Sequence, residues 1–292
     1  MMTRRGLLAA AAGVAASQQS LNAQPLTGAG KLTAPSEGNV PVAFPISDGA
    51  VIIDYCGPWE VFQDVQVPVG DKNVPGFTLY TVAKSLDPVT ASGGMKVIPN
   101  YTFANAPQPK VIVIPAQSGN NELIDWIKKA AAKSDLTMSV CTGAFKLAQT
   151  GLLAGKPATT HHSSYGAFAM TYRDVKLKRG ARFVEAGDNL ASAGGLTSGI
   201  DLAMRVVERY YGRTVAERTA FFMEYQSDGW KNASVNSVYA QKPKPGASVC
   251  AVCGMAVSPT ATLRSQYQNG VYLFCSQGCK DQFDSGPDEI VG

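Results

Sequence analysis

The hydrophobic positions of the chain follow two alternating periodicities between about residue 39 and residue 230. Short runs rich in β-branched and aromatic residues predict strands at 40–45, 77–83, 96–99, 111–114, 136–140, 158–160, 183–186 and 190–193. Segments with helical spacing predict helices at 60–64, 122–133, 143–150, 163–170, 199–211 and 215–225. This alternation is typical of an α/β fold, in which a mostly parallel sheet is covered by helices on both faces.

One junction between a predicted strand and a predicted helix carries a reactive residue. The strand at 136–140 is followed by Cys141, Thr142 and Gly143, and then by the helix at 143–150. This order is typical of a nucleophile elbow with cysteine in place of serine. Because the thiol would meet the positive end of the helix, the pattern predicts a lowered pKa and a thiolate at neutral pH. The alternative is that Cys141 is a small buried hydrophobic residue.

Composition and charge limit the class of protein. Of the 292 residues, 45% are hydrophobic and 16% are charged, which excludes a disordered chain and one embedded in a membrane. The length allows one large or two modest domains. The formal net charge of +4 becomes about +2 without Arg4 and Arg5, which is too small to indicate nucleic-acid binding.

The N-terminus has the pattern of an export signal. Arg4 and Arg5 precede a short apolar run of small residues, and Ala23 follows at a suitable cleavage point. Residues 1–23 therefore predict a Tat-type signal peptide and a mature protein that is periplasmic or secreted. The apolar run is too short to span a bilayer, which takes about 20 residues.

Four of the six cysteines lie close to the C-terminus. After an extended linker predicted at 231–248, residues 249–292 contain two pairs separated by 21 residues, Cys250 with Cys253 and Cys275 with Cys279. This spacing predicts a metal site, and the metal would stabilise a segment too small to fold on its own core. Four thiolates suit Zn(II), and a thioether from Met255 would also suit Cu(I). Two disulfides are the alternative, because export leads to an oxidising compartment.

Several motifs in residues 40–228 resemble the DJ-1/PfpI superfamily. They are Asp54-Tyr-Cys-Gly-Pro-Trp-Glu-Val-Phe62, Ser139-Val-Cys-Thr-Gly143, the run from Gly151 to His161, and Gly194-Gly-Leu-Thr-Ser-Gly-Ile-Asp201. Within the superfamily the chain is most similar to isonitrile hydratases and to the ligand-sensing domains of AraC-type regulators. The resemblance implies a flavodoxin-like sandwich, a homodimer, and a cysteine nucleophile at a strained elbow beside an acidic residue.

This resemblance also implies roles for individual residues. Cys141 would attack the terminal carbon of an isonitrile, and Asp54 would shuttle protons, without a cofactor. Backbone N–H groups near Thr142 and in the loop at Ala116 and Gln117 would stabilise developing charge. The family usually has Pro-Gly-Gly in that loop, so the two side chains of this sequence are expected to narrow the pocket or alter the amide geometry.

Two further residues near these motifs have open roles. Cys56 stands where the related hydratases carry threonine, and it is either a resolving thiol that pairs with Cys141 or a packing replacement. His161 matches a family position close to the nucleophile. It would orient the thiolate or polarise a bound carbonyl, or instead close a loop hydrogen bond.

The C-terminal segment is similar to the YHS and TRASH metal-binding modules. The similarity rests on Cys253-Gly-Met-Ala-Val257 and on the run from Tyr272 to Phe283. Together with the predicted signal peptide, the two resemblances favour an exported, cysteine-dependent enzyme of the isonitrile hydratase type with an appended metal module. The small net charge agrees with a small uncharged substrate. A non-catalytic metal or redox sensor, and a glyoxalase or deglycase, are the alternatives.

Overall fold

The computed structural model describes residues 29–240 and 242–291 of the chain. The predicted signal peptide at 1–23 lies outside the described residues. None of the helices within the described ranges has both the length and the apolar character needed to cross a membrane.

Seven strands form the central sheet, in the order β12, β13, β9, β8, β1, β4, β7. Their bounds are β1 (Val40–Pro45), β4 (Phe77–Ala83), β7 (Tyr101–Thr102), β8 (Val111–Ile114), β9 (Leu136–Val140), β12 (Phe183–Glu185) and β13 (Leu190–Ala193). Neighbouring strands are parallel except for β12 and β13, which pair antiparallel. The predicted mostly parallel sheet is therefore confirmed.

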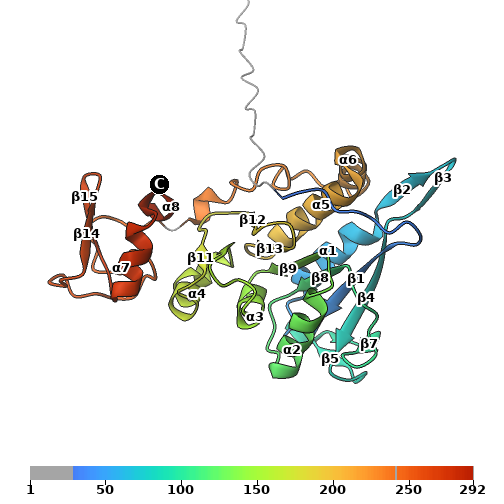
Figure 1. Ribbon diagram of the computed structural model, residues 1–292, viewed down its shortest axis with the longest axis horizontal. Coiled ribbons are helices and arrows are strands. Elements are labelled where there is room, and N and C mark those ends of the chain that lie inside the picture. Colours follow the sequence, from blue (N-terminus) through green and yellow to red (C-terminus); the bar gives the residue numbers. More distant parts are fainter. Residues whose placement is uncertain (1–28, 241, 292) are drawn as a thin grey trace, which may run out of the picture.

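Helices cover both faces of this sheet (Figure 1). On one face lie α1 (Ile52–Gln63), α5 (Ser198–Tyr211) and α6 (Arg213–Phe222). On the other face lie α2 (Asn121–Ala131) and α3 (Gly143–Gln149), and α4 (Tyr165–Thr171) packs beside α3 through the rings of Phe145 and Phe168. The predicted flavodoxin-like arrangement is thus present.

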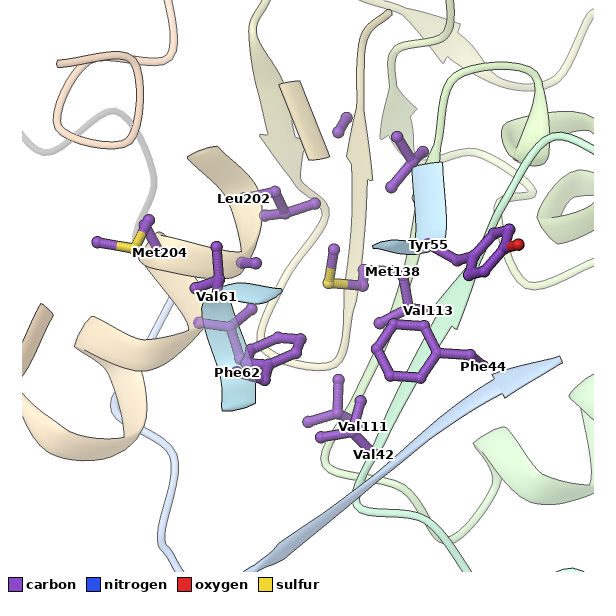
Figure 2. Packing of buried hydrophobic residues seen from close by; sticks show 14 of the residues in the cluster. Val42, Phe44, Tyr55, Val61, Phe62, Val111, Val113, Met138, Leu202 and Met204 are labelled. Carbon is purple, nitrogen blue, oxygen red and sulfur yellow. The ribbon is translucent and has the colours of Figure 1, made fainter. Parts of the chain in front are cut away.

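The core is divided by the sheet into two apolar clusters. Along β8, Val111 and Val113 face the cluster that contains α1 and α5, and Ile112 and Ile114 face the cluster that contains α2 and α3. All four side chains are fully buried, as a strand in the middle of a doubly covered sheet requires. Figure 2 shows the first cluster, in which Phe62 of α1 lies among side chains of the sheet and of α5.

Several short elements lie outside the central sheet. They are the strand pairs β2 (Gln66–Val69) with β3 (Lys72–Pro75), β5 (Val89–Thr90) with β6 (Lys96–Val97) and β10 (Pro157–Ala158) with β11 (Lys176–Leu177), and the 3₁₀ turns η1 (Ser92–Gly94), η2 (His162–Ser164) and η3 (Ser237–Tyr239). The strand predicted at 96–99 is the two-residue β6, and the helix predicted at 60–64 begins already at Ile52. The hairpin of β2 and β3 is mostly exposed, so its sequence lacks the hydrophobic alternation that predicts a strand.

The C-terminal segment forms a small unit of its own elements. It contains the hairpin β14 (Arg264–Tyr267) and β15 (Gly270–Leu273), followed by α7 (Gln277–Asp284) and α8 (Pro287–Val291). The first part of the predicted linker packs against the main domain. The carbonyl of Ala233 accepts a hydrogen bond from the Arg182 amide, and Asn236 is buried beside Ser198.

Candidate active site and metal centre

Cys141 occupies a strained turn at the carboxyl end of β9, directly before α3. Its φ angle is +57°, which is unusual for a residue other than glycine. The turn is fixed because the Cys141 amide donates to the Gly194 carbonyl at 2.8 Å and the Thr160 hydroxyl donates to the Cys141 carbonyl at 3.0 Å. A Cβ on Gly143 would collide with the carbonyl oxygen of Ile114, so glycine is required there. The geometry is that of a nucleophile elbow.

Asp54 lies in the first turn of α1 and is completely buried. Its Oδ2 accepts a hydrogen bond from the Ala116 amide at 3.0 Å, and its Oδ1 has no well-oriented donor within the described part of the chain. The Cys141 thiol interacts with this carboxyl group. Because the helix begins at Ile52, Asp54 is not a capping residue and its side chain is available to the thiol.

The Asp54 carboxyl group and the Cys141 thiol lie close together, and each changes the pKa of the other. Burial raises the pKa of Asp54 from 3.8 to about 7, although the Ala116 amide and the Cys141 thiol lower it. Burial and the charge of Asp54 raise the pKa of the Cys141 thiol from 9.0 to about 11. The predicted neutral-pH thiolate is therefore wrong, because the loss of water and the carboxylate outweigh the short helix α3.

Backbone N–H groups surround the sulfur of Cys141. The amides of Thr142 and Leu196 donate hydrogen bonds to it and lower its pKa against burial. Leu196 has a φ angle of +45° and follows Gly194 and Gly195, which lets its amide turn toward the elbow. Sequence reasoning named Thr142 but missed Leu196, whose contribution is a backbone group. The double glycine before a helix was the available clue.

The loop at Ala116 and Gln117 makes hydrogen bonds to Asp54 and to the end of β1. The Ala116 amide holds Asp54 and is already occupied as a donor. The Gln117 side chain donates to the Pro45 carbonyl at 2.9 Å and accepts from Ser47 at 2.8 Å. These side-chain hydrogen bonds hold the loop at the end of β1, and the Ala116 amide holds the Asp54 carboxylate against the loop.

His161 lies beside the glycine pair that leads to Leu196. A Cβ on Gly195 would lie 2.5 Å from the His161 ring, so a side chain there would collide with it. Nδ1 accepts from the Ser163 amide at 3.3 Å, and the ring lies against that of His162 at an interplanar angle of 33°, with centroids 4.3 Å apart. Burial and His162 lower the pKa of His161, which favours a neutral ring. The loop hydrogen bond that was one of its two predicted roles is present.

The structure places Cys56 on α1, two residues after Asp54. Side chains two positions apart leave a helix about 200° apart, so Cys56 does not share the direction of Asp54. Its thiol interacts with Tyr55 and Glu60, and both Cys56 and Cys141 are free cysteines. Burial raises the pKa of the Cys56 thiol, which reduces its reactivity.

Four sulfur atoms converge in the C-terminal unit. The Sγ atoms of Cys250, Cys253, Cys275 and Cys279 all lie within 4.8 Å of one another, and none forms a disulfide. The sulfur of Cys275 is 3.4 Å from that of Cys253 and 3.7 Å from that of Cys279. A tetrahedral ion with metal–sulfur bonds of about 2.3 Å separates its ligands by about 3.8 Å, so the cluster fits such an ion.

Backbone hydrogen bonds hold the turn that carries Cys250 and Cys253. The Cys250 amide donates to the Met255 carbonyl at 2.7 Å, and the Gly254 amide donates to the Cys250 carbonyl at 2.9 Å, which closes a tight turn. A hydrogen bond from the Cys253 thiol lowers the pKa of Cys250. The Met255 amide interacts with the Cys253 sulfur, whereas the Met255 side chain is 46% exposed. The structure thus gives Met255 a backbone role at this site.

Comparison with known proteins agrees with this arrangement of two units. Residues 40–209 match the DJ-1/PfpI family, and residues 251–292 match the YHS domain. Isonitrile hydratase from Pseudomonas putida is 33% identical over 179 residues, which are 59% of this chain and 73% of that enzyme.

A regulator and a solved structure are also similar to this chain. The HTH-type transcriptional regulator CdhR from Pseudomonas aeruginosa is 31% identical over 136 residues, 44% of this chain but only 39% of the regulator. A solved THiJ/PfpI family protein from Pseudomonas syringae superimposes with a TM-score of 0.57 at 28% identity, over 67% of this chain and 78% of that one. The chain therefore belongs to the DJ-1/PfpI family and carries a YHS domain at its C-terminus.

Proposed function

We propose that the main domain is a cysteine-dependent lyase that hydrates isonitriles to N-formyl amines. The observation that carries this proposal is the pair of Cys141 and Asp54. A buried carboxyl group with a pKa of about 7 beside a protonated thiol can accept and return a proton near neutral pH. The similarity to isonitrile hydratase, which covers 73% of that enzyme, supports the same substrate class.

The first half of the reaction adds the thiol across the terminal carbon of the isonitrile. The Asp54 carboxylate takes the thiol proton as the Cys141 sulfur bonds to that carbon, and Asp54 then gives the proton to the same carbon. The product is a thioimidate, R–N=CH–S, attached to Cys141. The amides of Thr142 and Leu196 stabilise negative charge on the sulfur while the proton is away.

The second half releases the product with one water molecule. Asp54 takes a proton from the water as its oxygen bonds to the thioimidate carbon, and the nitrogen receives that proton. The carbon–sulfur bond then breaks, the hydroxyl proton returns to sulfur through Asp54, and the N-formyl amine leaves. The carboxylate and the thiol are both restored, so no cofactor is consumed.

The test is formamide production from a simple alkyl or aryl isonitrile by the full-length, reduced protein. We expect Cys141→Ala and Asp54→Asn to lose at least about 100-fold in rate, because each removes an obligatory proton or bond. Cys56→Ala is expected to keep its rate within about twofold, since its side chain leaves α1 on a different side from Asp54. No turnover by the wild-type protein would contradict the proposal.

A metal-responsive binding protein is the second candidate function. The observation that favours it is the four-sulfur cluster, which is a complete ligand set without a position for substrate. Absence of isonitrile turnover, together with tight binding of one metal ion per chain, would favour this candidate over the lyase.

We further propose export by the Tat route and assembly into a homodimer. Arg4 and Arg5 support export, and the exposed rings of Phe221 and Phe222 at the end of α6 support contact with a second copy. An intact N-terminus on protein from the periplasm would contradict cleavage near Ala23. A monomeric mass by light scattering at high concentration would contradict the dimer.

A further inference from the structure

The C-terminal unit contacts the main domain through the turn that carries two of its cysteines. This turn, residues 250–253, meets α4 and the loop between β11 and β12. Figure 1 shows α4 as the main-domain helix beside the C-terminal unit. Side chains from both units, among them Phe168 and Phe274, belong to one buried apolar cluster.

Gly166 on α4 faces the backbone of Cys253. A Cβ at this position would overlap the carbonyl oxygen of Cys253, so the absence of a side chain allows backbone to meet backbone. The neighbouring Tyr165 is buried, and its hydroxyl accepts a hydrogen bond from the Gly180 amide at 2.9 Å. The main domain therefore offers a shaped surface for this turn.

Arg179 provides the charged part of the same surface. Its guanidinium lies over the ring of Tyr165, 5.5 Å from the centroid, and donates a hydrogen bond to the Val252 carbonyl. It also interacts electrostatically with Cys250 and Cys253. A planar guanidinium that is stacked on an aromatic ring and bonded to a carbonyl is held in one orientation.

The cluster needs a positive charge nearby when its four cysteines act as thiolates. A divalent ion leaves an excess of two negative charges, and Cys250, Cys253 and Cys279 are buried. Buried charge is costly unless it is paired. In the C-terminal unit Lys280 is already engaged with Asp284, whereas Arg179 of the main domain faces the turn between two ligands.

We propose that Arg179 is a positioning residue for the four-cysteine centre, so that metal affinity of the C-terminal unit depends on its docking against α4. This inference rests on the metal site proposed above. The guanidinium holds the Cys250 to Cys253 turn from outside and offsets the thiolate charge. By linkage, metal binding strengthens docking as much as docking strengthens metal binding.

The experiment measures the affinity of full-length protein for Zn(II) by competition with a chromophoric chelator. We expect Arg179→Met to weaken binding by about 10- to 100-fold, the range found when outer residues of metal sites are removed. Arg179→Lys keeps the charge but lacks the planar guanidinium, so its Zn(II) affinity should lie between those of the wild-type protein and Arg179→Met. Arg218→Met is the matched control, because the exposed Arg218 also donates a hydrogen bond to a main-chain carbonyl, that of Gln66 in β2, and we expect no change.

A second variant separates docking from charge. Gly166→Val blocks the approach of the Cys253 carbonyl but replaces neither a cysteine nor Arg179, and it should weaken Zn(II) binding and speed proteolysis at 242–249. Ala167→Val on the exposed neighbour is the control. Wild-type affinity in both Arg179→Met and Gly166→Val would overturn the inference, whereas no Zn(II) binding by the wild-type protein would overturn the metal site itself.

Discussion

Burial of the Asp54 carboxyl group in the core lowers the free energy of unfolding when the group is ionised in the unfolded chain. Its pKa is 3.8 in an ordinary setting and about 7 in the fold, so the folded state resists its ionisation. Well below pH 3.8 it is protonated in both states and costs nothing. As the pH rises from about 4 to about 7 the unfolded chain releases its proton first, and stability falls.

Asp54→Asn should therefore be more stable than the wild-type protein while being inactive. The amide oxygen can still accept from the Ala116 amide, and the ionisation penalty disappears. We expect a gain of about 2 to 4 kcal/mol in the free energy of unfolding at pH 8 and almost none at about pH 3. Denaturant unfolding at the two pH values measures it; equal stability of both proteins at pH 8 would show that burial does not penalise the carboxylate.

The same titration predicts the pH dependence of catalysis. The isonitrile is uncharged, and the thiol with a pKa of about 11 remains protonated over the accessible range, so Asp54 sets the profile. The value of kcat/KM should rise about tenfold per pH unit below pH 7 and level off above it. Rates corrected for the uncatalysed reaction test this, and a flat profile between pH 5 and pH 9 would exclude Asp54 as the proton acceptor.

At the scale of single residues, the sequence indicates which side chains belong to the site better than it indicates the burial and the charges around them. Cys141 and Asp54 were predicted because each stands in a recognisable sequence motif. Leu196 was missed because an amide donor has no side-chain signature. The shift of the Cys141 pKa was predicted with the wrong sign, because it depends on burial and on a carboxylate 87 positions earlier in the chain.

At the scale of elements, the elbow depends on the close passage of β8 under the start of α3. Gly143 is the residue that permits it, since a Cβ would meet the Ile114 carbonyl and lie 2.9 Å from the Pro115 carbonyl. We expect Gly143→Ala to cost more than about 2 kcal/mol of stability and to abolish turnover. Thermal unfolding and the isonitrile assay measure both effects.

A glycine in another helix provides the control for that substitution. Gly278 lies in α7, and a Cβ there would have its nearest atom 3.5 Å away, at Arg173. Gly278→Ala should be neutral or stabilise α7 by about 0.5 to 1 kcal/mol. Similar losses in both variants would mean that Gly143 acts through helix propensity and not through its contact with β8.

Elements with a strong hydrophobic pattern were predictable, and those without one were not. Every residue of strands β8 and β9 is buried, and the predicted bounds of both strands match the structure. The start of α1 was missed because Gly57 and Pro58 stand inside the helix, where the pattern favours a break. Tertiary contacts with α5 maintain the helix there, and these contacts are not visible in a local window.

At the scale of the whole molecule, two units of unequal size share one apolar cluster. The main domain has a seven-stranded sheet and can hold its fold without the tail. The C-terminal unit packs a few large side chains, chiefly Phe274 and Phe283, around the cysteines. The proposed metal would supply much of the stability of a unit this small.

Removal of the metal should therefore unfold the tail and leave the main domain intact. We expect a chelator to abolish a separate low-temperature transition in calorimetry and to expose residues 242–291 to protease, while a fragment that contains Cys141 and Asp54 survives. Because the sulfurs would then be free, alkylation of Cys250, Cys253, Cys275 and Cys279 should increase together. A chelated protein that resists both treatments, with a mass lower by four hydrogen atoms than the reduced chain, would show that two disulfides hold the tail instead.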